Sequence, residues 1–295
     1  MEFHALDKFI LGGLALKKVS DDGVVEGVTF TVKGNGVEKT VTTGKDGFVN
    51  VTGLFPGTYT ITEQTIDRYE PQEPQTVTVE GGKTATVTFS NKLKRGSLEV
   101  IKTAEDKFIE GVKFHLFGKS YAGTTVDEYA VTDKNGLAKF SNIPISGETP
   151  YTLEEVGAGE QYTIPDKLTA PIEWNKVTKR SLNNSLKKFR VNVVKKDADG
   201  TASQGEGSLA GAVYGIYKGD TLIDRYTTDK DGKFTTSYYT CDTDWTLREI
   251  SAPVGYTLDK TVYNIGSDPK LFTLTQNTVN MEVKETAAKG NIAII

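Results

Sequence analysis

Hydrophobic and polar residues alternate with a period of two along most of the chain. Short runs rich in Val, Thr, Tyr, Phe and Ile are separated by turns that contain Gly, Asp and Asn, as is typical of strands and the turns between them. No segment keeps a helical period of 3.6 residues with capping residues at its ends. The pattern therefore predicts an all-β protein in which strands bury one face.

The predicted strands recur three times in the same order. The first strand of each unit ends on a lysine, in Leu14–Lys18, Leu98–Lys102 and Val191–Lys195. Later in each unit a polar run contains Asp-Gly or Asn-Gly, and these pairs predict a tight hairpin because they adopt positive φ angles readily. The predicted hairpins lie at residues 44–47, 133–136 and 229–232. Such a repeat predicts a tandem array of similar domains.

We expect domain boundaries where the last strand of one unit meets the first strand of the next. The domains are then residues 1–93, 94–188 and 189–288, and residues 289–295 copy the opening of a further unit. The junctions are short and contain no Gly/Ser run, which favours limited swivelling between neighbours. Together these features predict three similar β-sandwiches joined end to end in a rod-like array.

The first two units each place three polar side chains on inward faces of strands. Lys18 has the parity of Leu14 and Leu16, so its amine is expected to point into the core. Glu63 and Asn91 occupy inward positions of two later strands by the same argument. The corresponding residues of the second unit are Lys102, Glu155 and Asn184. Burying charged groups costs free energy, so the trio indicates a chemical purpose.

The purpose that fits these three groups is a covalent cross-link. Burial lowers the pKa of a lysine amine and raises the pKa of a carboxyl, so a proton can pass between them. The neutral amine can then attack the asparagine amide, while the acid polarises the carbonyl and protonates the departing ammonia. Folding makes the reaction intramolecular. Each site reacts once, so we do not expect an enzyme.

The third unit keeps the lysine and the glutamate, as Lys195 and Glu249, but departs at its closing strand. Counting forward from Glu249 by the spacing of the other units reaches Asn277, whereas counting back from the next opening reaches Glu285. Two alternatives follow. Either Asn277 accepts a third cross-link with Glu249 as proton shuttle, or Lys195 forms a buried salt bridge with Glu249, Glu285 or both.

Composition narrows the classes of protein and of site. Hydrophobic residues are 37% and charged residues 25% of the chain, which suits folded domains. The formal net charge is -4 with both signs interspersed, so we expect no nucleic-acid partner, and no apolar run is long enough for membrane insertion. The single cysteine, Cys241, excludes an internal disulfide and is expected to be buried and unreactive. The two histidines, His4 and His115, have no partners at metal-ligand spacing, so no metal or cofactor is expected.

These motifs resemble the collagen-adhesin B-type (Cna-B) repeats of Gram-positive surface proteins. The resemblance is carried by the opening lysine strands, by the closing asparagines, and by the glutamate strands Tyr59–Glu63, Tyr151–Glu155 and Trp245–Glu249. Residues 249–256 are similar to the Glu-x-x-Ala-Pro-x-Gly-Tyr segment of SpaA-type pilin repeats. The resemblance covers nearly the whole chain. It implies inverse immunoglobulin-like sandwiches, surface display through sortase, and spontaneous Lys–Asn isopeptide bonds assisted by the acidic residue.

For this chain, the resemblance implies bonds from Lys18 to Asn91 and from Lys102 to Asn184. We expect a structural stalk or shaft segment of a bacterial adhesin or pilin. It would lie outside the cell and be anchored to the cell wall through other parts of a longer chain, with neighbouring repeats as its partners. The alternatives are an adhesive module that binds a host matrix protein or a glycan, and a cytosolic or periplasmic β-repeat scaffold without cross-links.

Overall fold

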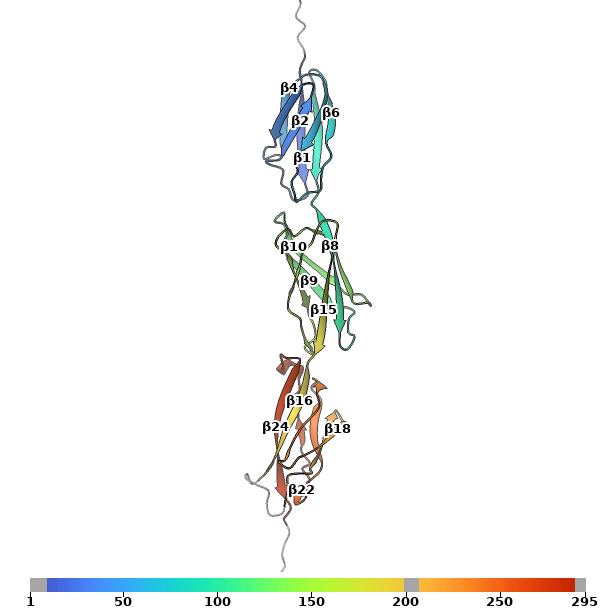
Figure 1. The fold of residues 1–295 in the computed structure, drawn as a ribbon, viewed down its shortest axis with the longest axis vertical. Helices are drawn as coiled ribbons and strands as arrows, with labels where there is room; N and C mark the ends of the chain where they lie inside the picture. The colour runs from blue at the N-terminus through green and yellow to red at the C-terminus, as the bar shows by residue number, and fades with distance from the viewer. Residues whose placement is uncertain (1–9, 199–206, 290–295) are drawn as a thin grey trace, which may run out of the picture. The chain divides into compact units, whose positions relative to one another are not determined.

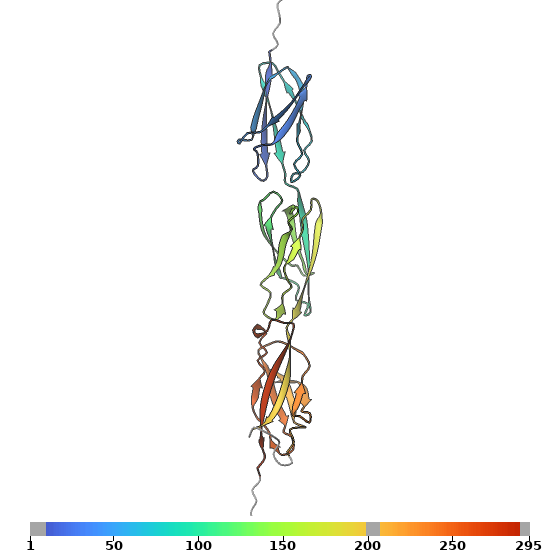
Figure 2. The same ribbon diagram turned by 60° about the vertical axis from the view of Figure 1, so that its left-hand side comes forward.

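The structure, a computed structural model, describes residues 10–198 and 207–289. Within them, three consecutive segments each form two β-sheets (Figures 1 and 2). The only helix in these residues is the short 3-10 turn η1 (Pro269–Leu271). The predictions of an all-β protein and of three similar sandwiches are therefore confirmed. Residues 290–295, most of the expected opening of a further repeat, lie outside the described residues.

The first sandwich is built from seven strands. They are β1 (Gly12–Ser20), β2 (Thr29–Gly34), β3 (Val37–Thr42), β4 (Phe48–Leu54), β5 (Gly57–Glu63), β6 (Gln75–Val79) and β7 (Thr84–Asn91). One sheet has the order β4-β1-β7 and the other β3-β2-β5-β6. β1 pairs antiparallel with β4 and parallel with β7. The first and last strands of the domain thus lie side by side and run in the same direction.

The second sandwich follows the same plan. Its strands are β8 (Arg95–Ala104), β9 (Lys113–Lys119), β10 (Thr125–Val131), β11 (Leu137–Pro144), β12 (Tyr151–Val156), β13 (Tyr162–Thr163), β14 (Leu168–Ala170) and β15 (Val177–Leu186). The sheets have the orders β11-β8-β15-β13 and β10-β9-β12-β14. Again the first long strand, β8, neighbours the last, β15. The chain forms two compact units, and the division between them runs through this segment.

The third sandwich has more strands between its first and its last. They are β16 (Lys188–Asp197), β17 (Val213–Lys218), β18 (Thr221–Thr227), β19 (Lys233–Thr235), β20 (Tyr239–Thr240), β21 (Trp245–Ser251), β22 (Tyr256–Thr257), β23 (Val262–Asn264) and β24 (Gln276–Ala287). One sheet has the order β19-β16-β24-β22, with β20 also paired to β16, and the other β18-β17-β21-β23. β16 and β24 are parallel neighbours, as β1 and β7 are.

The predicted hairpins at residues 44–47, 133–136 and 229–232 are tight turns that do not close hairpins. Each joins strands of two different sheets: β3 to β4, β10 to β11, and β18 to β19. In the first, Gly47 has a φ of 73° and its N–H donates to the carbonyl of Gly44. A true hairpin joins β2 to β3 across Asn35 and Gly36, whose φ angles of 48° and 75° suit a type I′ turn. The turn residues predicted the bend but not the pairing of the strands around it.

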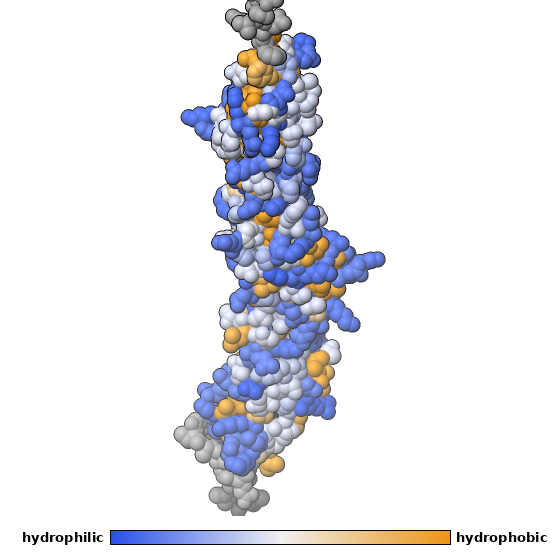
Figure 3. Space-filling model, turned by 45° about the horizontal axis from the view of Figure 1, so that its top comes forward, coloured by the Kyte–Doolittle hydropathy of each residue, from blue (hydrophilic) through white to orange (hydrophobic). Residues whose placement is uncertain are grey.

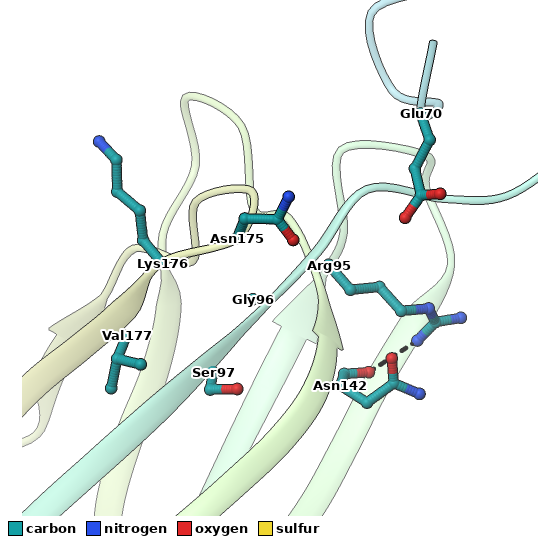
Figure 4. A pocket seen from close by; sticks show the side chains of 8 residues that line it. All are labelled: Glu70, Arg95, Gly96, Ser97, Asn142, Asn175, Lys176 and Val177. Atoms are coloured by element: carbon teal, nitrogen blue, oxygen red, sulfur yellow. Dashed lines mark hydrogen bonds between the residues drawn. The ribbon is translucent and has the colours of Figure 1, made fainter. Parts of the chain in front are cut away.

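The second domain also contains an irregular strand, β11. The register of β11 with β8 shifts between Phe140 and Ile143, and Asn142 has a φ of 61°. The Arg95 guanidinium donates to the Asn142 carbonyl at 2.8 Å (Figure 4). The hydrogen bond satisfies the carbonyl that the bulge leaves without a strand partner.

Candidate functional site

The first domain brings its predicted trio together between the two sheets. Lys18 on β1 and Asn91 on β7 belong to one sheet, and Glu63 on β5 belongs to the other. Lys18 Nζ lies 3.3 Å from Glu63 Oε2, and Asn91 Nδ2 donates to Glu63 Oε1. Lys18 and Asn91 are each 1% exposed and Glu63 8%. The carboxyl of one sheet therefore contacts both the amine and the carboxamide of the other.

The strand pattern explains this placement. Along β1, Leu14, Leu16 and Lys18 are buried while Lys17 is exposed, and β5 and β7 show the same alternation up to their last residues. In the parallel ladder, Lys18 is opposite Phe89, so Asn91 lies two residues further along on the same face. The hydrophobic side chains that fill the core thereby fix the three polar groups at its edge.

The second domain repeats the arrangement. Lys102 Nζ on β8 lies 3.6 Å from Glu155 Oε2 on β12, and Asn184 Nδ2 on β15 donates to Glu155 Oε1 at 2.6 Å. Lys102 is 1%, Glu155 9% and Asn184 2% exposed. The same three residue types therefore meet in the same way in two domains with different surrounding sequences.

The polar groups of both trios lack part of their ordinary solvation. Burial lowers the pKa of Lys18 and of Lys102, and the nearby glutamate carboxyl opposes that effect only in part. The Asn91 and Asn184 Oδ1 atoms are buried and have no hydrogen-bond partner among the residues that the structure describes. A buried carbonyl oxygen without a donor is costly. Each asparagine carbonyl oxygen can therefore accept a further hydrogen bond, and the amide that carries it lies against the glutamate carboxyl.

The third domain brings Lys195 and Glu249 together as predicted, but with Glu285 as the third group. Lys195 Nζ lies 2.5 Å from Glu249 Oε1 and also contacts Glu285 Oε2. All three side chains are fully buried. Lys195 Nζ further donates to the hydroxyl of Tyr214 at 2.9 Å. Of the two alternatives from the sequence, the structure has the buried salt bridge of Lys195 with both glutamates.

The structure does not bring Asn277 to Lys195. Asn277 is opposite Phe189 near the start of β24, whereas Lys195 is opposite Val283. The Asn277 side chain instead donates to the carbonyls of Lys188, at 3.0 Å, and Leu274, at 2.7 Å. The count from Glu249 failed because the loop between β21 and β24 is longer in this domain. This loop contains the short strands β22 and β23 and the 3-10 turn η1.

A tyrosine–aspartate pair beside each site was not predicted. Tyr69, Tyr162 and Tyr256 donate from their hydroxyls to Asp22 at 2.6 Å, Asp106 at 2.6 Å and Asp197 at 2.9 Å, respectively. Burial acts to raise the pKa of Asp22, but hydrogen bonds from Tyr69 and other donors outweigh it and hold the pKa below its ordinary value. The signal was present in the sequence: each tyrosine follows the site glutamate by six or seven residues.

The other candidate groups lie apart from these sites. Within residues 10–198 and 207–289, no cluster of three or more His, Cys, Asp or Glu could hold a metal ion. His115 contacts Glu154 and Asp127 on the outer surface of the second domain. Burial raises the pKa of the Cys241 thiol to about 11, and His4 lies outside the described residues. In the described part of the chain, no helix is long and apolar enough to cross a membrane.

Comparison with known proteins places the chain in a family. No curated protein sequence matches it. Among solved structures, it resembles the Bacillus anthracis TIE protein with a TM-score of 0.61 at 22% identity, over 93% of this chain and 50% of that one. The chain thus spans about half the length of that protein, and the likeness shows a shared fold.

More distant likenesses include BcpA, the major pilin subunit of Bacillus cereus (TM-score 0.47, 12% identity, 94% of this chain and 100% of that one). Another is the major pilin SpaD from Corynebacterium diphtheriae (TM-score 0.29, 15% identity, 94% and 98%). The family described as "SpaA: Prealbumin-like fold domain" matches residues 12–93, 96–186 and 189–287. These matches follow the three sandwiches. The chain therefore belongs to the SpaA family of prealbumin-like fold domains and carries three of them in tandem.

Proposed function

We propose that the chain is a structural shaft segment of a Gram-positive surface protein, stabilised by amide cross-links from Lys18 to Asn91 and from Lys102 to Asn184. The observation that carries the proposal is the same buried trio in two domains, each joining the first and last strands across a carboxyl of the opposite sheet. The chain carries three SpaA-family domains in tandem. This supports a surface shaft built from repeated domains.

The geometry supports a direct reaction path in the first domain. Burial favours the neutral amine of Lys18, and Glu63 is the acceptor for its proton. A half-turn of the Asn91 amide would present Oδ1 to the protonated Glu63, which would polarise the carbonyl. The amine then attacks the carbonyl carbon. Glu63 passes the first proton to the amide nitrogen and takes a second proton from the attacking nitrogen, the C–N bond to the amide nitrogen breaks, and ammonia leaves.

The bond would stabilise the domain mainly by reducing the conformational entropy of the unfolded chain. A cross-link from residue 18 to residue 91 closes most of the domain into a loop. The loop-entropy relation used for disulfides gives roughly 4–5 kcal/mol for loops of this size. Since a small domain has only about 5–15 kcal/mol in total, such a bond would decide whether it stays folded outside the cell.

The adhesive alternative stays a prediction. On the face seen in Figure 3, hydrophobic residues lie in small separate areas among hydrophilic ones. Large exposed apolar patches are what mark many binding surfaces. This face therefore gives no specific reason to prefer ligand binding over a shaft role.

Intact-mass measurement of the full chain tests the proposal. We expect these two domains to account for a loss of two ammonia molecules relative to the sequence mass. Tryptic peptides from β1 and β7 should be recovered joined, as should those from β8 and β15. Recovery of all four as separate linear peptides would show that neither cross-link forms.

The variant Glu63→Gln tests the proton-shuttle role. Glutamine cannot take the lysine proton, so Asn91 should keep its side-chain amide and the cross-link should not form. The first domain should then unfold at a lower temperature, while the second domain stays cross-linked. The matched control is Glu38→Gln, because Glu38 is an exposed residue of the same domain whose side chain is 61% accessible. A Glu63→Gln chain that still joins its β1 and β7 peptides would remove the role assigned to Glu63.

A further inference from the structure

In the third domain, Glu285 occupies the position that asparagine holds in the first. Lys18 is opposite Phe89 in its parallel ladder, and Asn91 follows two residues later. Lys195 is opposite Val283 in the corresponding ladder, and Glu285 follows two residues later. The site therefore presents a carboxyl, in place of a carboxamide, to the lysine amine.

The surroundings of the two glutamates of this site differ. Glu249 Oε2 accepts a hydrogen bond from the backbone N–H of Asp259 at 2.8 Å, and Glu249 Oε1 lies 2.5 Å from Lys195 Nζ. Glu285 is 0% exposed, and neither of its carboxyl oxygens has a hydrogen-bond partner in the described structure. Among those residues, the polar group that its carboxyl contacts is Lys195 Nζ.

These surroundings set the charges of the three groups. One ammonium can balance one buried carboxylate, and a second buried negative charge without a partner is strongly disfavoured. Glu249 holds both the hydrogen bond from the Asp259 backbone and the contact with Lys195, so we assign it as the carboxylate that the single ammonium balances. Glu285, which has no such donor, is then the neutral acid. A neutral carboxylic acid is also the form that an amine can attack, because its hydroxyl can leave as water.

We propose that Lys195 and Glu285 condense into an amide with the release of one water molecule. Glu249 takes one proton from the Lys195 ammonium, and the amine nitrogen attacks the carboxyl carbon of Glu285. A second nitrogen proton passes through Glu249 to the departing hydroxyl, the C–O bond breaks, and water leaves. The third proton stays on the amide nitrogen, and Glu249 ends protonated. Protons and charge balance without any further reactant.

Proximity lowers the barrier to this condensation relative to the same groups free in bulk water. Groups held in reacting geometry behave as if at effective concentrations of about 10⁵ M or more, and all three side chains are fully buried. The proposal rests on the same proton transfer as the cross-links proposed for the first two domains. It differs from them in its acceptor and in its leaving group.

Peptide mapping of the full chain tests this bond separately from the other two. Trypsin does not cleave after a lysine held in an amide, so the wild-type chain should yield a β16 peptide containing Lys195 joined to a β24 peptide. The expected mass is the sum of the two minus one water. Glu285→Gln should yield the same joined product by loss of ammonia, because both reactions end in the same amide. The control Glu282→Gln changes an exposed residue of β24 and should leave the wild-type product unchanged.

Each outcome decides the proposal. Joined peptides in the wild type, and separate ones in Glu285→Ala and Glu249→Gln, would support it. Separate peptides in the wild type but joined ones in Glu285→Gln would overturn it and leave an unreacted salt bridge. Separate peptides in both would also overturn it. Because the Lys18 and Lys102 peptides are read in the same digest, failure at Lys195 alone leaves the proposed function standing, whereas linear peptides at all three sites would remove both.

Discussion

At the scale of single residues, side-chain parity predicted which polar strand residues are buried in the core. The alternation Leu14, Leu16, Lys18 required the amine to face the core, and Lys18 is 1% exposed. The Tyr69–Asp22 pair was not predicted, because a loop tyrosine has no strand parity from which its direction can be read. The identity of a strand residue therefore located its chemistry, while contacts made by loop residues needed the folded structure.

The Tyr69–Asp22 pair gives a prediction for acid stability. The folded-state pKa of Asp22 is below its ordinary value of 3.8, so the carboxylate contributes stability above that pH and loses it as the pH falls. We expect Asp22→Asn to be less stable than the wild type at neutral pH and to lose less stability between about pH 5 and about pH 2. Calorimetry across this range measures the difference.

The matched control for this prediction is Asp67→Asn, because Asp67 lies in the same domain outside its buried core. Its loss of stability in acid should follow that of the wild type. If Asp22→Asn and the wild type lose stability in parallel as the pH falls, the hydrogen-bonded carboxylate does not contribute in the way described.

At the scale of strands and turns, register is better predicted than loop length. Within β24, the two-residue period correctly separates Val283 and Glu285, which face inward, from their exposed neighbours. The choice of Asn277 failed because it counted through a loop, whose length no strand geometry constrains. The prediction of hairpins at the glycine turns was wrong for a related reason. Gly47 bends the chain whether or not the next strand joins the same sheet.

Gly47 gives a prediction at this scale, because its turn lies against the backbone of the lysine strand. Lys18 N–H donates to the Gly47 carbonyl at 2.8 Å, and a Cβ on Gly47 would lie 2.8 Å from the Lys18 carbonyl oxygen. We expect Gly47→Ala to lower the free energy of unfolding and to slow the proposed joining of the Lys18 and Asn91 peptides. Denaturant titration and timed digestion after refolding would measure both effects.

Gly53→Ala is the control, since Gly53 has a φ of 71° but a Cβ added there would meet no atom within 4 Å. It carries the cost of a positive φ for a residue with a Cβ, roughly 1–2 kcal/mol, without displacing the lysine strand. Equal effects of the two substitutions on the joining rate would show that the contact with Lys18 is unimportant.

At the scale of the whole molecule, the tandem domains have separate cores. One buried cluster contains Leu16, Phe30 and Phe89 of the first domain, and another contains Val191, Tyr214 and Val283 of the third. Each cluster is bounded by its own two sheets. The repeat in the sequence predicted three similar domains. Their end-to-end arrangement stays a prediction.

Separate cores predict separate unfolding transitions. Asn91→Ala removes the proposed acceptor of the first domain, so it should lower one calorimetric transition by the equivalent of roughly 4–5 kcal/mol and leave the others in place. Asn184→Ala should lower a different transition, and the double variant should show the sum within about 0.5 kcal/mol. A single transition that shifts as a whole would contradict independent domains.

The parallel pairing of first and last strands also determines how a domain meets a stretching force. The chain enters the first domain at one end of the β1–β7 ladder and leaves it at the other, so tension acts along the strands. The hydrogen bonds between Gly13↔Thr84 and Ser20↔Asn91 are then loaded together in shear, not peeled apart one at a time. The ladder from Lys188↔Gln276 to Asp197↔Glu285 has the same geometry. Many hydrogen bonds must then break at once, which slows unfolding, and forced unfolding is governed by that rate. The geometry therefore resists tension without any covalent bond.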